Sequence, residues 1–288
     1  MTFGLGEHLV QAIVLDIEGT TTPIAFVYDV LFPFARAHLG EHLRQHLDTD
    51  ELREALRRLR AEWVEDVAQA ESPPDWSLSR VRLKPDTTVD SAHGSPDDRL
   101  TVRLKPDTTV DSAHDSPDDR LTAQIESVTA YVEWLMDRDR KSPGLKLLQG
   151  QIWERGYRAG LLKGEVFPDV PTALQRWRDA RIEVAIYSSG SVLAQRLIFS
   201  STPYGDLTAF ISQFFDTASG AKTSPDSYRR IAGDLACPAE RMLFISDVTK
   251  ELDAARSVGC QVLLCVRPAN PPQTDGGFSV IRSLDEIA

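Results

Sequence analysis

Apolar residues follow two different patterns along the chain. Near the beginning, and again beyond residue 165, they form short runs rich in β-branched residues, such as VQAIVLDI at residues 10–17. Runs of this length that end in glycine, serine or threonine are typical of buried strands. The pattern predicts strands at residues 13–17, 182–187, 242–246 and 261–266.

Helical segments are expected between the later strands. We predict helices at residues 170–180, 192–199, 224–235 and 250–258, with Pro171 and Pro225 in the first turns of two of them. Strands that alternate with helices form a parallel sheet covered on both faces. The strand near residue 13 needs the same sheet, so the expected fold class is α/β.

From about residue 26 to residue 160 the spacing of apolar residues changes. Leu52, Leu56, Leu59, Trp63 and Val67 follow at three- and four-residue steps, and similar steps recur further on. This is the period of an amphipathic helix. The chain is therefore predicted to form a discontinuous α/β core, residues 1–23 and 165–288, with a helical cap, residues 24–164, inserted into it.

A tandem repeat interrupts the predicted cap. Residues 81–100 read VRLKPDTTVDSAHGSPDDRL, and residues 102–121 repeat them except that Asp115 replaces Gly94. The repeat is rich in proline, aspartate, serine and threonine and has no aromatic residue, so it offers little to bury. We expect a disordered insertion at about residues 71–122 rather than a two-unit solenoid. Its His93 and His114 are expected to be solvated rather than to bind metal.

Composition narrows the range of partners. Of the 288 residues, 42% are hydrophobic and 26% are charged, and the formal net charge is −11. This charge argues against binding of nucleic acid or anionic membranes, but not against a small anionic substrate held by a metal ion and N–H groups. No apolar segment approaches the ~20 residues needed to cross a bilayer, and the first residues lack a signal-peptide pattern. The cytoplasm is therefore the expected location. Cys260 and Cys265 lie in or beside the apolar run GCQVLLCV and are expected to be buried, reduced thiols, and the three cysteines have no metal-ligand spacing.

The clearest candidates for chemistry are Asp16 and Glu18, in the string DIEGTT. Residues at the carboxyl ends of parallel strands face the ligand crevice, and alternation along the chain places both carboxylates on the same side. Two neighbouring acids repel each other unless a cation intervenes, and Mg²⁺ suits both oxygen ligands and a phosphate substrate. One acid could attack phosphorus while the other moves protons. The simpler alternative is a polar turn with two solvated acids.

Three further candidates adjoin predicted strands or helices. Ser188 and Ser189 follow a strand, Lys222 precedes a helix, and Asp247 follows another strand, with Glu251 one helical turn later. Hydroxyl and N–H groups at a helix start suit an anion, a lysine can neutralise phosphate, and Asp247 can supply a metal with another oxygen. Each also has a simpler explanation, because serine and aspartate commonly cap helices and a lone lysine is usually exposed.

The order of these residues is more specific than any one of them. An acid pair, a serine, a lysine and a further acid, each near a strand end, resemble the four motifs of the haloacid dehalogenase-like superfamily. Within it the chain is similar to the enolase-phosphatases of methionine salvage in the strings DIEGTTTPIAFVYDVLFPFAR, FPDVPTAL, YSSGSVLAQRLIFS and SDVTKELDAA. Phosphatases of the superfamily usually have aspartate where this chain has Glu18. The similarity fails only over about Glu71–Thr122.

The resemblance implies a Rossmann-like core with a helical cap, and a role for each acid. Asp16 matches the nucleophile and a Mg²⁺ ligand. Glu18 matches the acid/base residue and a further metal ligand, in part through its backbone carbonyl, and Asp247 matches the remaining metal ligand. One Mg²⁺ per subunit and a monomeric state are implied as well.

The other candidates match groups that bind the substrate. Ser188 and Ser189 match the substrate-binding serines, and Lys222 matches the lysine that contacts phosphate. The family's substrate is a phosphorylated diketone, 2,3-diketo-5-methylthiopentyl-1-phosphate. It is enolised and then dephosphorylated to the acireductone 1,2-dihydroxy-3-keto-5-methylthiopentene.

Other functions remain open at this point. A general phosphatase for sugar phosphates or nucleotides, or a phosphomutase, would keep the same acids. Dehalogenases lack the second acid and transport ATPases have threonine there, so Glu18 argues against both. A non-catalytic binding protein would not need a nucleophile. In the cap, Phe26, Trp63 and Trp153 are candidates for lining the pocket, with packing between cap helices as the alternative.

Overall fold

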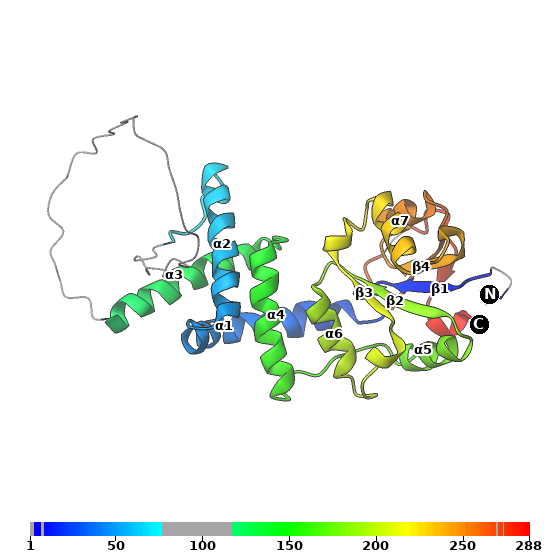
Figure 1. Cartoon of the computed structure of the whole chain (residues 1–288), viewed down its shortest axis with the longest axis horizontal. Coiled ribbons are helices and arrows are strands. Elements are labelled where there is room, and N and C mark those ends of the chain that lie inside the picture. Colours follow the sequence, from blue (N-terminus) through cyan, green and yellow to red (C-terminus); the bar gives the residue numbers. More distant parts are fainter. Residues whose placement is uncertain (1–2, 7–8, 77–116, 269, 273) are drawn as a thin grey trace, which may run out of the picture.

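The computed structural model describes residues 3–6, 9–76, 117–268, 270–272 and 274–288 of the chain (Figure 1). Within these residues, parallel strands form a six-stranded sheet in the order β3-β2-β1-β4-β5-β6. The strands are β1 (Ala12–Leu15), β2 (Glu183–Tyr187), β3 (Gln213–Phe215), β4 (Met242–Ser246), β5 (Gln261–Cys265) and β6 (Val280–Ile281). Because β1 pairs with both β2 and β4, its carboxyl end lies in the middle of one sheet edge.

Helices cover both faces of the sheet because the strands are apolar on both sides. On one face Ile13 and Leu15 belong to a core that α5 and α6 complete, and on the other face Ala12 and Val14 pack with α7 and α8. Figure 1 shows α5 and α6 on one side of the strands and α7 on the other. These helices are α5 (Val170–Asp179), α6 (Val192–Ser200), α7 (Pro225–Asp234) and α8 (Thr249–Arg256).

The predicted fold class is confirmed, and so are the four predicted strands and the four helices between them. The first strand ends at Leu15 rather than at residue 17, which leaves Asp16 in the loop beyond it. The predictions miss β3 and β6, because three and two residues are too few for a strand pattern to show.

The described chain between residues 26 and 158 contains four long helices and a π-helix (Phe26–Leu31). The long helices are α1 (Phe32–His46), α2 (Asp50–Ala68), α3 (Pro117–Asp137) and α4 (Pro143–Arg158). Side-chain caps set two of their starts: Thr49 accepts the amide of Leu52 at 3.3 Å before α2, and Ser142 accepts the amide of Leu145 at 2.9 Å before α4. The four helices lie beyond the carboxyl ends of the strands (Figure 1).

The prediction of a disordered insertion at about residues 71–122 differs from the structure at both ends of this range. Trp76 is buried and lies 5.3 Å from the Tyr131 ring, and the Trp63 indole donates to the Pro74 carbonyl at 2.8 Å. Helix α3 begins at Pro117, inside the second repeat copy. Residues 77–116, with His93 and His114, lie outside the described residues, so for them disorder stays a prediction. The division of the chain into core and cap at residues 23 and 165 stays a prediction as well.

Other elements are short. They are 3₁₀ helices at Thr208–Phe210, Thr217–Ser219, Ala239–Arg241 and Leu284–Glu286. The three cysteines are buried and free, which confirms the prediction made for Cys260 and Cys265. Among the helices described, none combines the length and the apolar character that a bilayer span requires.

Replacing two helical glycines by alanine should change the stability of the protein in opposite directions. A Cβ at Gly144 in α4 would lie 2.7 Å from the backbone nitrogen of Leu59 in α2, whereas a Cβ at Gly40 in α1 would approach nothing closer than 3.6 Å. We expect Gly144→Ala to lower the free energy of unfolding by about 2 kcal/mol, because the two helices must separate. Gly40→Ala should raise it by about 0.5–1 kcal/mol through helix propensity. Urea unfolding followed by circular dichroism measures both, and equal effects would contradict this packing of α2 against α4.

Candidate active site

The loop after β1 holds Asp16 at the centre of the sheet edge. Asp16 is 2% exposed, and its Oδ1 accepts the amide of Ile17 at 2.8 Å. The amides of the three threonines at 20–22 all point to the Ile17 carbonyl, at 2.9–3.1 Å, and the Thr21 hydroxyl donates to the Asp16 carbonyl at 3.0 Å. Gly19 allows this tight turn with φ at +73°. The string GTTT thus fixes the backbone that carries Asp16.

Lys222 lies against this carboxylate. Its Nζ is 2.5 Å from Asp16 Oδ1 and 2.7 Å from Glu251 Oε2, and its side chain is 9% exposed. Burial acts to lower the pKa of Lys222, but the carboxylates of Asp16 and Glu251 outweigh it and hold this pKa above its ordinary value. Lys222 is therefore a fixed positive charge beside Asp16 and not an exposed surface lysine.

Ser246, the last residue of β4, closes a ring with these groups. Its Oγ lies 3.1 Å from Asp16 Oδ2 and 2.9 Å from Glu251 Oε2, and it accepts the amide of Val248 at 3.1 Å. Burial and the negative charge of Asp16 raise the pKa of Glu251 to about 7. Asp16, Lys222, Glu251 and Ser246 thus form a closed ring of contacts, which we call the acid–lysine ring.

Asp247 follows directly and points toward the β1 loop. It is buried, and its Oδ2 accepts a hydrogen bond from the Asn270 amide at 3.3 Å, while the same amide donates to the Gly19 carbonyl at 2.9 Å. The N-cap of α8 is Val248, so Asp247 does not cap this helix and the simpler explanation for it fails. Burial raises the pKa of Asp247 to about 7, and the negative charge of Asp16 is the second cause of this increase.

Glu18 meets the loop after β2. Its Oε2 accepts from the Ser188 hydroxyl at 3.3 Å, and burial, with the charge of Asp16, raises its pKa. Ser188 also accepts the amide of Gly190 at 3.1 Å. The cap of α6 is instead Ser191, whose Oγ accepts the amide of Ala194. Ser188 is therefore not needed as a helix cap.

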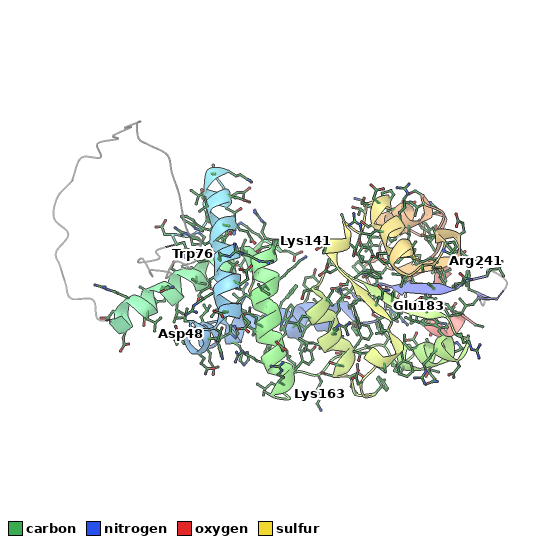
Figure 2. The ribbon with its side chains drawn as sticks, viewed as in Figure 1. Asp48, Trp76, Lys141, Lys163, Glu183 and Arg241 are labelled. Carbon is green, nitrogen blue, oxygen red and sulfur yellow. The ribbon has the colours of Figure 1, made fainter. Side chains whose placement is uncertain are left out.

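All six predicted site residues line one cavity of about 790 Å³. They are Asp16, Glu18, Ser188, Ser189, Lys222 and Asp247. Figure 2 shows Glu183 and Arg241, which lie at the amino ends of β2 and β4, on the side of the sheet away from the four long helices. The cavity is thus at the opposite, carboxyl edge, where the strand-end argument places it.

Residues before residue 160 form the other wall of this cavity. Its apolar members include Val27, Leu31, Met136, Leu145 and Trp153. Its basic members are Arg36, Arg140, Lys141 and Lys146, of which Figure 2 labels Lys141 just before α4. Of the aromatic residues proposed for the pocket, only Trp153 lines it, and its indole also donates to the Leu31 carbonyl at 2.8 Å.

Sequence reasoning misses three residues that organise the site. Ser246 carries the same signal as Asp247, a polar residue at the end of an apolar strand, and could have been found. Gln195 in α6 donates to the carbonyls of Gly190 and Phe215 at 2.9 and 2.8 Å and so holds the serine loop. Nothing in the local sequence marks Gln195 or Asn270, because their partners are distant in the chain or belong to the backbone.

The carboxylates of this site are chemically suitable ligands for a divalent cation. Asp16, Glu18, Asp247 and Glu251 gather around Lys222, and mutual repulsion contributes to the raised pKa of three of them. Hard oxygen donors with excess negative charge suit Mg²⁺. In the part of the chain that the structure describes, however, no three His, Cys, Asp or Glu side chains are grouped so as to hold a metal ion. An ion bound here would need oxygen atoms besides these carboxylates.

Comparison with known proteins identifies the family. A family model of haloacid dehalogenase-like hydrolases matches residues 10–259. The chain belongs to this family. As such a hydrolase, it is similar to the enolase-phosphatase E1 of Synechococcus elongatus, with 38% identity over 96% of this chain and 98% of that one.

Two further relatives extend the comparison. A probable bifunctional methylthioribulose-1-phosphate dehydratase/enolase-phosphatase E1 of Populus trichocarpa is 41% identical over 98% of this hydrolase, which spans 48% of that protein's length. The chain thus covers about half of its plant relative. The crystal structure of UTR4 from Saccharomyces cerevisiae is similar with a TM-score of 0.65 and 29% identity, over 95% of this chain and 98% of that one. The predicted resemblance to the enolase-phosphatases is confirmed.

The raised pKa values of Asp247 and Glu251 predict how the metal-free hydrolase responds to pH. In the unfolded chain these carboxyl groups have ordinary pKa values of 3.8 and 4.5, whereas in the folded protein both pKa values lie at about 7. Between these values the folded state binds more protons, so the free energy of unfolding should fall as the pH rises toward 7 and then level off. Asp247→Asn should remove part of this slope and stabilise the protein at pH ~8 by on the order of 2 kcal/mol.

Urea unfolding in EDTA at several pH values between ~5 and ~8 measures this slope. Asp234→Asn, which changes an exposed carboxyl group on α7, is the matched control and should leave the slope as it is. An unchanged slope in Asp247→Asn would contradict the prediction.

Proposed function

We propose that this hydrolase is an enolase-phosphatase that converts 2,3-diketo-5-methylthiopentyl-1-phosphate to the acireductone and phosphate in methionine salvage. The observation that carries the proposal is the buried carboxylate of Asp16, held between Lys222 and Ser246 at the floor of the cavity. The names of the relatives supply the substrate class. The cytoplasmic location, the monomeric state and the absence of nucleic-acid and membrane partners stay predictions.

In the phosphatase step, Asp16 attacks phosphorus and becomes an aspartyl-phosphate. Lys222, within 2.5 Å of this carboxylate, neutralises charge on the phosphoryl group as it moves. The hydroxyls of Ser188 and Ser189 hold phosphate or carbonyl oxygens. Glu18, with its raised pKa, can hold a proton for the leaving oxygen and then accept one from the water that hydrolyses the aspartyl-phosphate.

We further propose one Mg²⁺ per subunit, held by the carboxylates of Asp16 and Asp247 and by Glu18, in part through its backbone carbonyl. A backbone oxygen answers the need for donors besides the carboxylates. Bound there, the ion would act as a Lewis acid toward the carbonyl and phosphoryl oxygens of the substrate. Asn270 holds Asp247 and the Gly19 carbonyl together, which keeps this side of the site in place.

In the enolisation step, the proposed base is Glu18. The apolar wall, which includes Leu31, Met136 and Trp153, excludes water and fits a methylthio tail. The same wall also carries basic residues, among them Lys141 and Lys146. An enolase-phosphatase needs both features, because its substrate joins an apolar end to an anionic one.

Asp16→Asn should abolish phosphate release. The amide cannot act as the nucleophile, and we expect kcat to fall roughly 10³-fold or more. Phosphate release and the ultraviolet absorbance of the enediol are followed together, with and without Mg²⁺, and Asp234→Asn serves as the control. Phosphate release from other phosphomonoesters but not from the diketone would keep the mechanism and remove the pathway assignment.

Glu18→Gln separates the two steps. If Glu18 removes the carbon-bound proton, the variant should lose exchange of substrate hydrogen with deuterated water by about 10²-fold or more, together with phosphate release. Nuclear magnetic resonance of the substrate in D₂O measures the exchange. Exchange at the wild-type rate would show that another group is the base.

A further inference from the structure

Three consecutive backbone carbonyls just before α7 each accept a hydrogen bond from a buried hydroxyl group. The pairs are Tyr187 with Gly220 at 2.9 Å, Ser227 with Ala221 at 2.8 Å, and Tyr228 with Lys222 at 2.6 Å. We call these three hydroxyl-bearing residues the hydroxyl clamp. Ser227 and Tyr228 come from α7 and Tyr187 from β2, so the clamp fixes the loop to both the helix and the sheet.

The clamp is itself rigid. Tyr187 and Tyr228 are fully buried and Ser227 is 1% exposed. The two tyrosine rings meet edge to face at 5.7 Å, and Tyr228 also lies 5.0 Å from the ring of Phe244 in β4. Rings packed in this way cannot follow a shift of the loop, so their hydroxyls define where the loop carbonyls lie.

The local sequence permits this close approach. Gly220 has φ at +120°, and a Cβ there would lie 2.2 Å from the Ser227 hydroxyl. A residue other than glycine would therefore separate the loop from α7. The string SGAKTSPDSY thus contains both the glycine that lets the loop approach and two of the hydroxyls that hold it.

The fixed loop determines the position of the Lys222 backbone. The side chain of Lys222 is a four-carbon stem with free rotation, so the position of Nζ depends on a fixed backbone as well as on its charged partners. Nζ lies 2.5 Å from Asp16, 2.7 Å from Glu251 and 5.9 Å from the centre of the Tyr187 ring. The Lys222 carbonyl, held by Tyr228, belongs to the same residue.

We propose that Tyr187, Ser227 and Tyr228 are positioning residues for Lys222 in phosphoryl transfer. They touch neither substrate nor Asp16 and act by setting the place of the lysine ammonium group. The inference rests on the proposed function, because it assigns Lys222 to the phosphate. Its expected signature is an effect on catalysis that disappears when the lysine is absent.

Tyr228→Phe is the sharpest variant, because it keeps the ring and removes only the hydroxyl. We expect kcat/KM to fall about tenfold, as for the loss of one well-placed buried hydrogen bond. In a Lys222→Met background the same change should alter kcat/KM less than about twofold. The Tyr228 hydroxyl is proposed to act through Lys222, so the effects of the two substitutions should not be additive. Tyr187→Phe and Ser227→Ala should lower kcat/KM in the same Lys222-dependent way, but by less than Tyr228→Phe does.

Tyr157→Phe is the matched control. This tyrosine in α4 is also buried, and its hydroxyl has no hydrogen-bond partner within the described part of the structure. Its loss should leave kcat/KM as in the wild type. Thermal unfolding of every variant reports stability separately, so a fall in activity caused by unfolding can be recognised.

Binding of inorganic phosphate in the presence of Mg²⁺, measured by calorimetry, tests the clamp without turnover. Tyr228→Phe should weaken phosphate binding, and Tyr157→Phe should not. If the wild type hydrolyses neither the diketone nor an aryl phosphate, the proposed function fails while the phosphate titration still decides the clamp. Equal effects of Tyr228→Phe with and without Lys222, or effects no larger than those of Tyr157→Phe, would overturn the inference.

Discussion

The acid–lysine ring is the constraint on which the rest of the structure depends. It places one ammonium group within 2.7 Å of two carboxylates that are almost removed from water. Burial and the negative charge of Asp16 raise the pKa of Glu251 even though Lys222, which acts to lower it, lies beside this carboxylate. A nucleophilic carboxylate must be ionised to attack phosphorus, so a fixed positive charge beside Asp16 is a requirement of the proposed chemistry.

The parallel sheet brings the groups of the acid–lysine ring together, so that a positive charge lies beside Asp16. Asp16 and Ser246 are 230 residues apart in the chain, yet their strands are neighbours in register, so their side chains meet at one edge. Lys222 reaches the same point from a loop that three hydroxyls hold. The four members of the ring therefore come from three segments of the chain, because Ser246 and Glu251 both belong to the region where β4 leads into α8. The sheet holds these segments next to one another.

Much of this could be predicted from the sequence, and the reasons for the gaps are physical. Asp16 and Asp247 follow apolar strands long enough to recognise, so their meeting at one edge follows from the topology. Glu18 follows the same strand as Asp16 and is found by the same argument, whereas Lys222 needed the order of the motifs. Gln195 and Asn270 donate to backbone carbonyls, and Asn270 also to the Asp247 side chain. Such partners leave no local pattern in the sequence. β3 and β6 are too short to show one.

The segment predicted to be an insertion adjoins the end of α3 that begins at Pro117. On the other side of this segment, Trp76 packs on Tyr131. The cavity wall takes Met136 from the other end of α3, about 28 Å away at 1.5 Å per residue. The cavity-lining end of α3 is therefore the end away from Pro117. At the sheet edge, by contrast with this end of α3, the loops that carry Asp16 and Lys222 form part of the site and are held by hydrogen bonds at successive backbone groups.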